Sequence, residues 1–198
     1  TRLSKYFKLI YKDFDLLEFK EEEGDKIEPK YFLPIIPTIL INGGSGIAVG
    51  FASNILNRNV LDVISECEKC LRGKDPINIP PKLNGFLGSY SQDPENPKKW
   101  IITGKLEIVN TTTIRISELP PSMTYEKYED ILDKLVESKL ISSSDDNCKD
   151  NINYTIKMSR SDLSSLTESD LIKLLKLEES ETEIYTTLDE SGTLKIFE

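Results

Sequence analysis

Apolar side chains recur at helical spacing in four stretches of the chain, at about residues 3–10, 60–72, 125–136 and 163–177. Intervals of three, four and seven residues place such side chains on one face of a helix. Thr124 precedes the third stretch and is suited to cap it, because its hydroxyl can accept a hydrogen bond from an amide of the first turn. The pattern therefore predicts four helices.

Alternation of apolar and polar residues predicts strands in the second half of the chain. Residues 100–120 are predicted to form a hairpin that bends near Asn110-Thr111, residues 152–158 a single strand, and residues 184–197 a hairpin that turns at Ser191-Gly192. Strands joined by short turns pair antiparallel. We therefore expect an α+β fold, a mostly antiparallel sheet flanked by helices.

The stretch from residue 27 to residue 59 has a different character, because it is apolar and rich in prolines and glycines. Prolines exclude a regular helix, whereas glycines permit positive φ and close approach of the backbone to a partner. The residues concerned are Pro29, Pro34, Pro37, Gly43, Gly44, Gly46 and Gly50. Just before this stretch, the acidic residues 21–25 predict a solvated turn.

Composition limits the classes of function. The 198 residues have a net charge of -9, which argues against a surface that holds nucleic acid by its overall charge and leaves a non-enzymatic interaction module as one alternative. No apolar run approaches the roughly 18 residues of a membrane span, and no signal-peptide layout is present. We therefore expect a cytoplasmic protein with no membrane partner.

Most familiar catalytic systems are excluded by what the chain lacks. It contains no histidine and only three cysteines, so nucleophiles paired with histidine and most zinc sites cannot form. The pair Cys67 and Cys70 has no second pair to complete a metal site, and Cys67 falls on the apolar stripe of a predicted helix. The acidic clusters at 21–25, 145–146 and 178–183 are predicted to be solvated loops. We expect no metal site.

The glycine-rich residues 42–50 allow three interpretations. A nucleotide-binding enzyme could cradle phosphate there, although the dinucleotide fingerprint would need glycine in place of Val49 and no Gly-Lys-Ser/Thr triplet exists. Ile47, between Gly46 and Ala48, could instead be a core residue in a tight loop. It could also be a wedge, since a stiff aliphatic side chain between small neighbours can enter a base step from the minor groove.

These residues carry a family resemblance. Residues 40–50, LINGGSGIAVG, and the following 52–55, ASNI, closely resemble the segment of bacterial gyrase A subunits in which an isoleucine inserts into the gate DNA. Residues 27–37, IEPKYFLPIIP, and 84–88, NGFLG, look more like eukaryotic type II topoisomerases. This blend is similar to the medium subunits of T-even bacteriophage topoisomerases. The resemblance covers nearly the whole chain, is strongest over 27–60, and remains collinear through Glu118-Leu119-Pro120 and the terminal hairpin.

The resemblance implies a division of the chain and the place of its chemistry. Residues 1–30 would be the C-terminal tail of a winged-helix domain, and residues 31–198 the tower domain. The triplet Thr1-Arg2-Leu3 matches one that follows the nucleophilic tyrosine in the family, so that tyrosine is expected about three residues before Thr1. Tyr6 lies on the wrong side of the triplet. No catalytic residue is therefore expected within the 198 residues, which alone would bind DNA weakly and not cleave it.

The resemblance also implies the partners. These are double-stranded DNA, a second copy of the same subunit, and a separate subunit that carries the ATPase and the TOPRIM domain; in a phage enzyme they would meet in the cytoplasm of the infected bacterium. Mg²⁺ and ATP would bind to other segments or subunits. Ile47 would intercalate, and phosphate contacts are predicted for the backbone amides of Asn42, Gly43, Gly44, Ser45 and Gly46 and for the side chain of Arg58.

Overall fold

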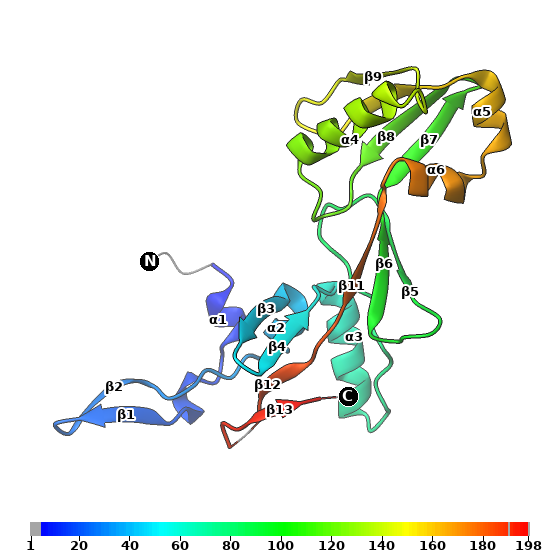
Figure 1. Ribbon diagram of the computed structural model, residues 1–198. Coiled ribbons are helices and arrows are strands. Elements are labelled where there is room, and N and C mark those ends of the chain that lie inside the picture. Colours follow the sequence, from blue (N-terminus) through cyan, green and yellow to red (C-terminus); the bar gives the residue numbers. More distant parts are fainter. Residues whose placement is uncertain (1–4, 190, 198) are drawn as a thin grey trace.

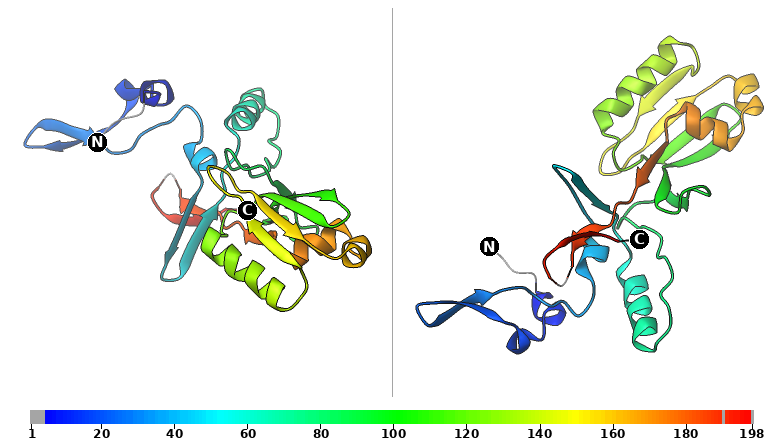
Figure 2. Two further views of the ribbon diagram at one scale, coloured as in Figure 1. Left: turned by 90° about the horizontal axis from the view of Figure 1, so that it is seen from above. Right: turned by 60° about the horizontal axis from the view of Figure 1, so that its bottom comes forward.

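The computed structural model describes residues 5–189 and 191–197, which form an elongated molecule whose C-terminal strands return to its centre (Figure 1). The N-terminal part holds a short helix, a 3₁₀ turn and a two-stranded hairpin: α1 (Phe7–Ile10), η1 (Phe14–Leu16), β1 (Phe19–Glu22) and β2 (Asp25–Pro29). Both views of Figure 2 show this hairpin projecting away from the rest. The predicted acidic turn is exposed as expected, but only Glu23-Gly24 form the turn itself, and the residues around them lie in strands.

The first predicted helix is shorter than expected, since only Phe7–Ile10 are helical among the described residues. Its predicted beginning at residue 3 and the triplet Thr1-Arg2-Leu3 lie outside the described residues. The boundary at residue 30 between a winged-helix tail and a tower domain stays a prediction.

The centre of the molecule contains α2 (Thr38–Asn42), the hairpin β3 (Gly44–Ala48) and β4 (Phe51–Ile55), and α3 (Val60–Leu71). The expectation that prolines exclude helix from this stretch was wrong for α2, which begins directly after Pro37. Proline is compatible with the start of a helix because the first amides have no partner within it. The predicted helix 60–72 is confirmed as α3, capped by the Asn59 side chain, which accepts from the Leu61 amide at 2.9 Å.

A three-stranded sheet joins this centre to the far end. Its order is β11-β6-β5, from β5 (Ser89–Gln92), β6 (Lys99–Thr103) and β11 (Glu178–Thr182). The chain leaves this sheet after β6 and returns as β11, so residues 105–177 form an insertion between two paired strands (Figure 1). We call residues 105–177 the head. The predicted hairpin of 100–120 is thus divided, because β6 pairs with β5 and β11 and the true hairpin begins at Lys105.

The head is a four-stranded antiparallel sheet of order β7-β8-β10-β9 with three helices: β7 (Lys105–Asn110), β8 (Thr113–Glu118), β9 (Ser143–Asp146), β10 (Tyr154–Lys157), α4 (Tyr125–Glu137), α5 (Arg160–Ser165) and α6 (Glu168–Leu174). Its interior is apolar, with Ile114, Ile116 and Ile156 from the sheet packed against Tyr128 and Leu171 from the helices. This cluster is the main core of the described residues, and the α+β class is confirmed.

Three further predictions concern the helices and strands of the second half of the chain. The predicted helix 163–177 is two helices, because Thr167 and Asp170 form a reciprocal capping box that starts α6 and ends the helical run of α5. Thr124 caps α4 as predicted, its hydroxyl accepting from the Lys127 amide. The terminal hairpin is confirmed as β12 (Thr186–Leu188) and β13 (Leu194–Ile196).

Candidate nucleic-acid interface

The hairpin β3–β4 carries two aliphatic side chains that touch almost nothing in the chain. Ile47 pairs across the strands with Ala52, and Val49 stands in the two-residue turn with Gly50. Ile47 is 94% exposed and Val49 is fully exposed. Burying an aliphatic side chain stabilises a folded protein by about 1.5–3 kcal/mol. Neither Ile47 nor Val49 makes this contribution, because both are exposed. The interpretation of Ile47 as a core residue was therefore wrong.

Of three glycines in and beside this hairpin, the fold requires two, each for a different physical reason. Gly43 has φ of 65°, and a Cβ there would lie 2.6 Å from the Ile55 carbonyl oxygen, so only glycine fits. Gly50 has φ of 84° in the turn, a conformation that glycine adopts without strain. Gly46, beside Ile47, has neither constraint, because its φ is ordinary and nothing lies within 4 Å of an added Cβ. The fold does not require glycine at position 46, which leaves open space beside Ile47 for a partner.

The base of the hairpin is held firmly although its tip is free. Asn54 and Ile184 exchange two backbone hydrogen bonds of 2.9 Å, and the Asn54 side-chain amide donates to Glu181 at 3.0 Å and to the Thr182 carbonyl at 2.9 Å. Two residues beyond β4, the Asn57 side-chain amide donates to the carbonyl of Asn42, the last residue of α2, at 2.7 Å. The tip is therefore presented by a fixed base and not by a loose loop.

Below the hairpin, one buried carboxylate gathers five hydrogen bonds. Glu183 is 1% exposed and accepts two bonds from Arg58, at 2.5 and 2.6 Å. Its other donors are the Trp100 indole at 2.8 Å, the Tyr185 hydroxyl at 2.8 Å and the Leu56 amide at 2.9 Å. The prediction that the acidic run 178–183 is solvated is wrong for Glu183: its partners lie more than 80 residues away along the chain, apart from Tyr185.

The electrostatics of Glu183 follow from these contacts. Burial opposes ionisation, but the Arg58 guanidinium and the Leu56 amide outweigh it, so the pKa of Glu183 lies below its usual range. Burial, together with the hydrogen bond to this carboxylate, raises the pKa of Tyr185 to about 12. The site therefore holds an ionised carboxylate and a neutral phenol at physiological pH.

The predicted phosphate contact from Arg58 is contradicted by its surroundings. The side chain of Arg58 is almost wholly buried, and besides Glu183 it donates to the carbonyls of Ile79 at 3.1 Å and Leu56 at 2.6 Å. A guanidinium used in this way has little left to offer a ligand. Sequence alone could not reveal this, because a lone arginine gives no sign of a partner 125 residues away.

The predicted amide contacts have mixed outcomes. The Gly43 amide donates to the Ile39 carbonyl at 2.9 Å at the end of α2, so it is not free for a phosphate. Gly44, Ser45 and Gly46 lie exposed on β3, where alternate amides point toward the partner strand and the others away from it. Asn42 is exposed at the last position of α2. For these four residues the phosphate contact stays a prediction.

The nucleotide-binding alternative does not fit the geometry of residues 43–50. Phosphate-cradling glycine loops lead directly into a helix whose free amides face the anion. Here the glycines form β3 and its turn, and the next element is β4. The residues 42–57 also carry no charged side chain. Within the described ranges 5–189 and 191–197, no group of three or more histidine, cysteine or acidic side chains is placed to hold a metal ion.

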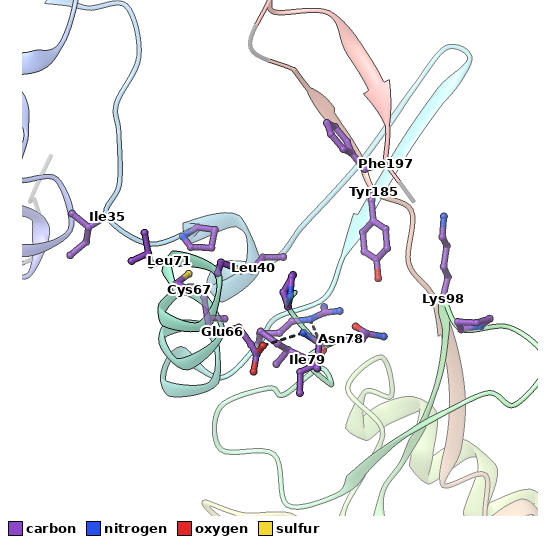
Figure 3. A pocket seen from close by; sticks show the side chains of 17 residues that line it. Ile35, Leu40, Glu66, Cys67, Leu71, Asn78, Ile79, Lys98, Tyr185 and Phe197 are labelled. Carbon is purple, nitrogen blue, oxygen red and sulfur yellow. Dashed lines mark hydrogen bonds between the residues drawn. The ribbon is translucent and has the colours of Figure 1, made fainter. Parts of the chain in front are cut away.

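A hollow lies beside Arg58 and the groups that it contacts. It has a volume of about 940 Å³ and is bounded on one side by α3, with Glu66, Cys67 and Leu71, and on the other by Tyr185 and Phe197 (Figure 3). The stripe of α3 is thus only partly packed, since Val63 is buried whereas Leu71 is 88% exposed. Cys67, expected in the core, is half-buried on the α3 side of the hollow.

None of the helices in the part of the chain that the structure describes is long and apolar enough to cross a membrane.

Known proteins resemble this chain over nearly its whole length. A family model that describes the A subunits of DNA gyrase and topoisomerase IV matches residues 1–197. DNA topoisomerase 2 of Plasmodium falciparum is 30% identical over 95% of this chain, and human DNA topoisomerase 2-alpha is 29% identical over all of it. The crystal structure of the Plasmodium falciparum topoisomerase II DNA-binding, cleavage and re-ligation domain matches 96% of this chain with a TM-score of 0.82 and 30% identity.

These matches also set the scale of the chain. It spans 14% of the length of each of those two topoisomerases and 27% of the chain in the solved structure. The match of the family model from residue 1 to residue 197 nevertheless includes every element of the fold. The chain belongs to the family of DNA gyrase and topoisomerase IV A subunits.

Proposed function

We propose that this chain is the part of a type II DNA topoisomerase that binds and bends the gate DNA, with Ile47 as the wedge. The observation that carries the proposal is the 94% exposure of a stiff aliphatic side chain at the tip of a hairpin whose base is fixed. Space beside Gly46 would let a base pair approach the backbone. An aliphatic wedge that unstacks one base step costs a few kcal/mol and kinks the duplex.

In this proposal two copies of the subunit face each other across one duplex, and each inserts Ile47 into a symmetric step. Bending a site of about 20–30 base pairs costs roughly 1–6 kcal/mol, which is offset by the contacts that the bend permits. Bent DNA places the scissile phosphates within reach of the tyrosine that attacks them, and we propose that this tyrosine lies outside residues 1–198. The contribution of this chain is then to shape the substrate.

The remaining partners are proposed on the same basis. A separate subunit would supply the ATPase and the TOPRIM domain, as in the phage enzymes whose mixed bacterial and eukaryotic motifs this sequence resembles, and the enzyme would work in the cytoplasm of the infected bacterium. We propose that Mg²⁺ and ATP bind to other segments or subunits.

The test compares Ile47→Ala with Leu61→Ala in the complete enzyme. Leu61 is a matched control, since it is also aliphatic and 73% exposed but lies on α3. Bending is measured by fluorescence transfer between the two ends of a gate duplex. We expect Ile47→Ala to reduce bending and cleavage with the fold intact, and Leu61→Ala to change neither. Equal bending by the two variants would refute the wedge.

The alternative of a non-enzymatic interaction module, which the net charge of -9 left open, does not agree with the comparisons, because the chain belongs to a family of topoisomerase subunits. The proposed function requires salt-sensitive affinity for double-stranded DNA in the complete enzyme.

A further inference from the structure

Glu183 lies where three parts of the chain meet. The hairpin strand β4 ends one residue before Leu56, whose amide donates to Glu183, and Arg58 follows two residues later. Trp100 comes from β6, the strand that leads into the head. Glu183 itself directly follows β11, the strand that returns from the head. One carboxylate therefore connects the hairpin with both strands that carry the head.

The geometry of this contact is specific. Arg58 and Glu183 are joined through two parallel N–H···O bonds, a planar arrangement that fixes the orientation of both groups as well as their distance. The neighbouring segment adds to it, because Ile184 pairs with Asn54 of β4 through two backbone bonds. Residues 181–184 thus run along the outer side of β4 at the base of the hairpin.

A buried ion pair is a poor way to gain stability alone. Removing two charges from water costs several kcal/mol each, so well-packed apolar residues of similar volume often stabilise a core equally well. Directional bonds do what apolar packing does less well, since they are strong in only one arrangement. Five such bonds on Glu183 join the base of the hairpin to the sheet β11-β6-β5.

We propose that the Arg58–Glu183 pair is a positioning device that fixes the direction in which the hairpin presents Ile47. Neither side chain touches DNA; both act through the backbone of β4. This inference rests on the proposed wedge function and adds that the wedge depends on the segment returning from the head. A hairpin without this pair would keep its own strand pairing but sample a range of angles, so that fewer molecules present Ile47 toward a base step.

The test uses three variants of the complete enzyme. Glu183→Gln keeps the size of the side chain and removes its charge. Arg58→Lys keeps the positive charge but cannot make two parallel bonds. Glu178→Gln is the matched control, because Glu178 is an exposed residue of β11. Two properties are measured: hydrogen exchange of the β4 amides without DNA, and bending of gate DNA by fluorescence transfer.

We expect Glu183→Gln and Arg58→Lys to speed exchange at residues 51–56 by about tenfold or more while exchange in the head core is unchanged. Bending should fall by at least about threefold in both, with Glu178→Gln like the unmodified enzyme. The Lys variant separates positioning from charge compensation, since a role in compensating charge alone would leave its bending intact. It also keeps the test open should Glu183→Gln fail to fold.

The outcomes separate the two proposals. Unchanged β4 exchange in Arg58→Lys overturns the positioning role whatever happens to DNA. Faster exchange with full bending also overturns it, provided Ile47→Ala reduces bending in parallel. If Ile47→Ala leaves bending intact while the hairpin of Arg58→Lys is loosened, the wedge function fails instead, and the pair is shown to hold a hairpin of another purpose.

Discussion

The head and the β3–β4 hairpin use the same kinds of aliphatic residue in opposite ways. In the head, Ile114, Ile116 and Ile156 are wholly buried among each other and against Tyr128. In the hairpin, Ile47 faces solvent. An isoleucine in the head stabilises the fold, whereas Ile47 contributes almost nothing to it. The contrast shows that apolar character alone does not indicate a core, and we propose that the function of this chain depends on the exposed isoleucine.

The largest expected effect on stability is that of a substitution in the core of the head. Ile116→Ala leaves a cavity in a closed apolar core, so we expect the free energy of unfolding to fall by about 2–5 kcal/mol. Ile47→Ala should change it by less than about 0.5 kcal/mol, as for other surface residues. Urea unfolding of both variants measures the difference. Similar losses would remove the contrast between the two regions.

Gly43→Ala should have the next largest effect on stability. The added Cβ would meet the Ile55 carbonyl oxygen at 2.6 Å and the residue would be forced to positive φ, so we expect a loss of about 1–3 kcal/mol. Thermal unfolding measures it, with Gly24→Ala as a control that has positive φ but open space around the Cβ. If both variants lose the same stability, the clash at the base of the hairpin is not what requires glycine.

The Arg58–Glu183 pair predicts a dependence on pH. Because the pKa of Glu183 in the folded chain is lowered, its contribution to stability is complete above the unfolded pKa of a glutamate, about 4.3, and is lost as pH falls through the folded value. The groups that face it are Arg58, Tyr185 and the Trp100 indole. Chemical denaturation between pH 7 and pH 3 should show a smaller loss in Glu183→Gln than in the unmodified chain; an identical loss would contradict the assignment.

The smallest effect on stability is expected at Gly46. Gly46→Ala adds a methyl group into open space at a residue whose φ is ordinary, so the free energy of unfolding should change by less than about 0.5 kcal/mol. DNA bending by the complete enzyme should nevertheless fall, since the methyl group occupies the space beside Ile47. Unchanged bending would show that DNA does not approach the backbone there.

Local patterns in the sequence were sufficient for elements whose cause is local. The helices α3 and α4 follow from apolar periodicity and from their caps, Asn59 and Thr124. The break between α5 and α6 was missed although its capping box lies in the sequence, because the leucine stripe continues through Thr167. The division of the predicted hairpin 100–120 depends on β11, which returns to pair with β6 only after the whole head, and no local pattern reports such pairing.

The candidate site was predictable in one half only. The family resemblance indicated Ile47, but the residue pattern alone favoured a core residue, and Val49, two residues further on, was not singled out as a candidate. The buried pair of Arg58 and Glu183 has no local signature, because neither the residues around Arg58 nor the acidic run around Glu183 indicate a distant partner. Only the fold brings the two together.

The most direct test of the wedge places 2-aminopurine, whose fluorescence rises when it unstacks, at successive positions across the centre of a gate duplex. With the complete enzyme bound, we predict increased fluorescence at one symmetric pair of steps, and loss of that increase in Ile47→Ala but not in Leu61→Ala. An increase of equal size in Ile47→Ala would contradict the account, because some other group would then be opening the step.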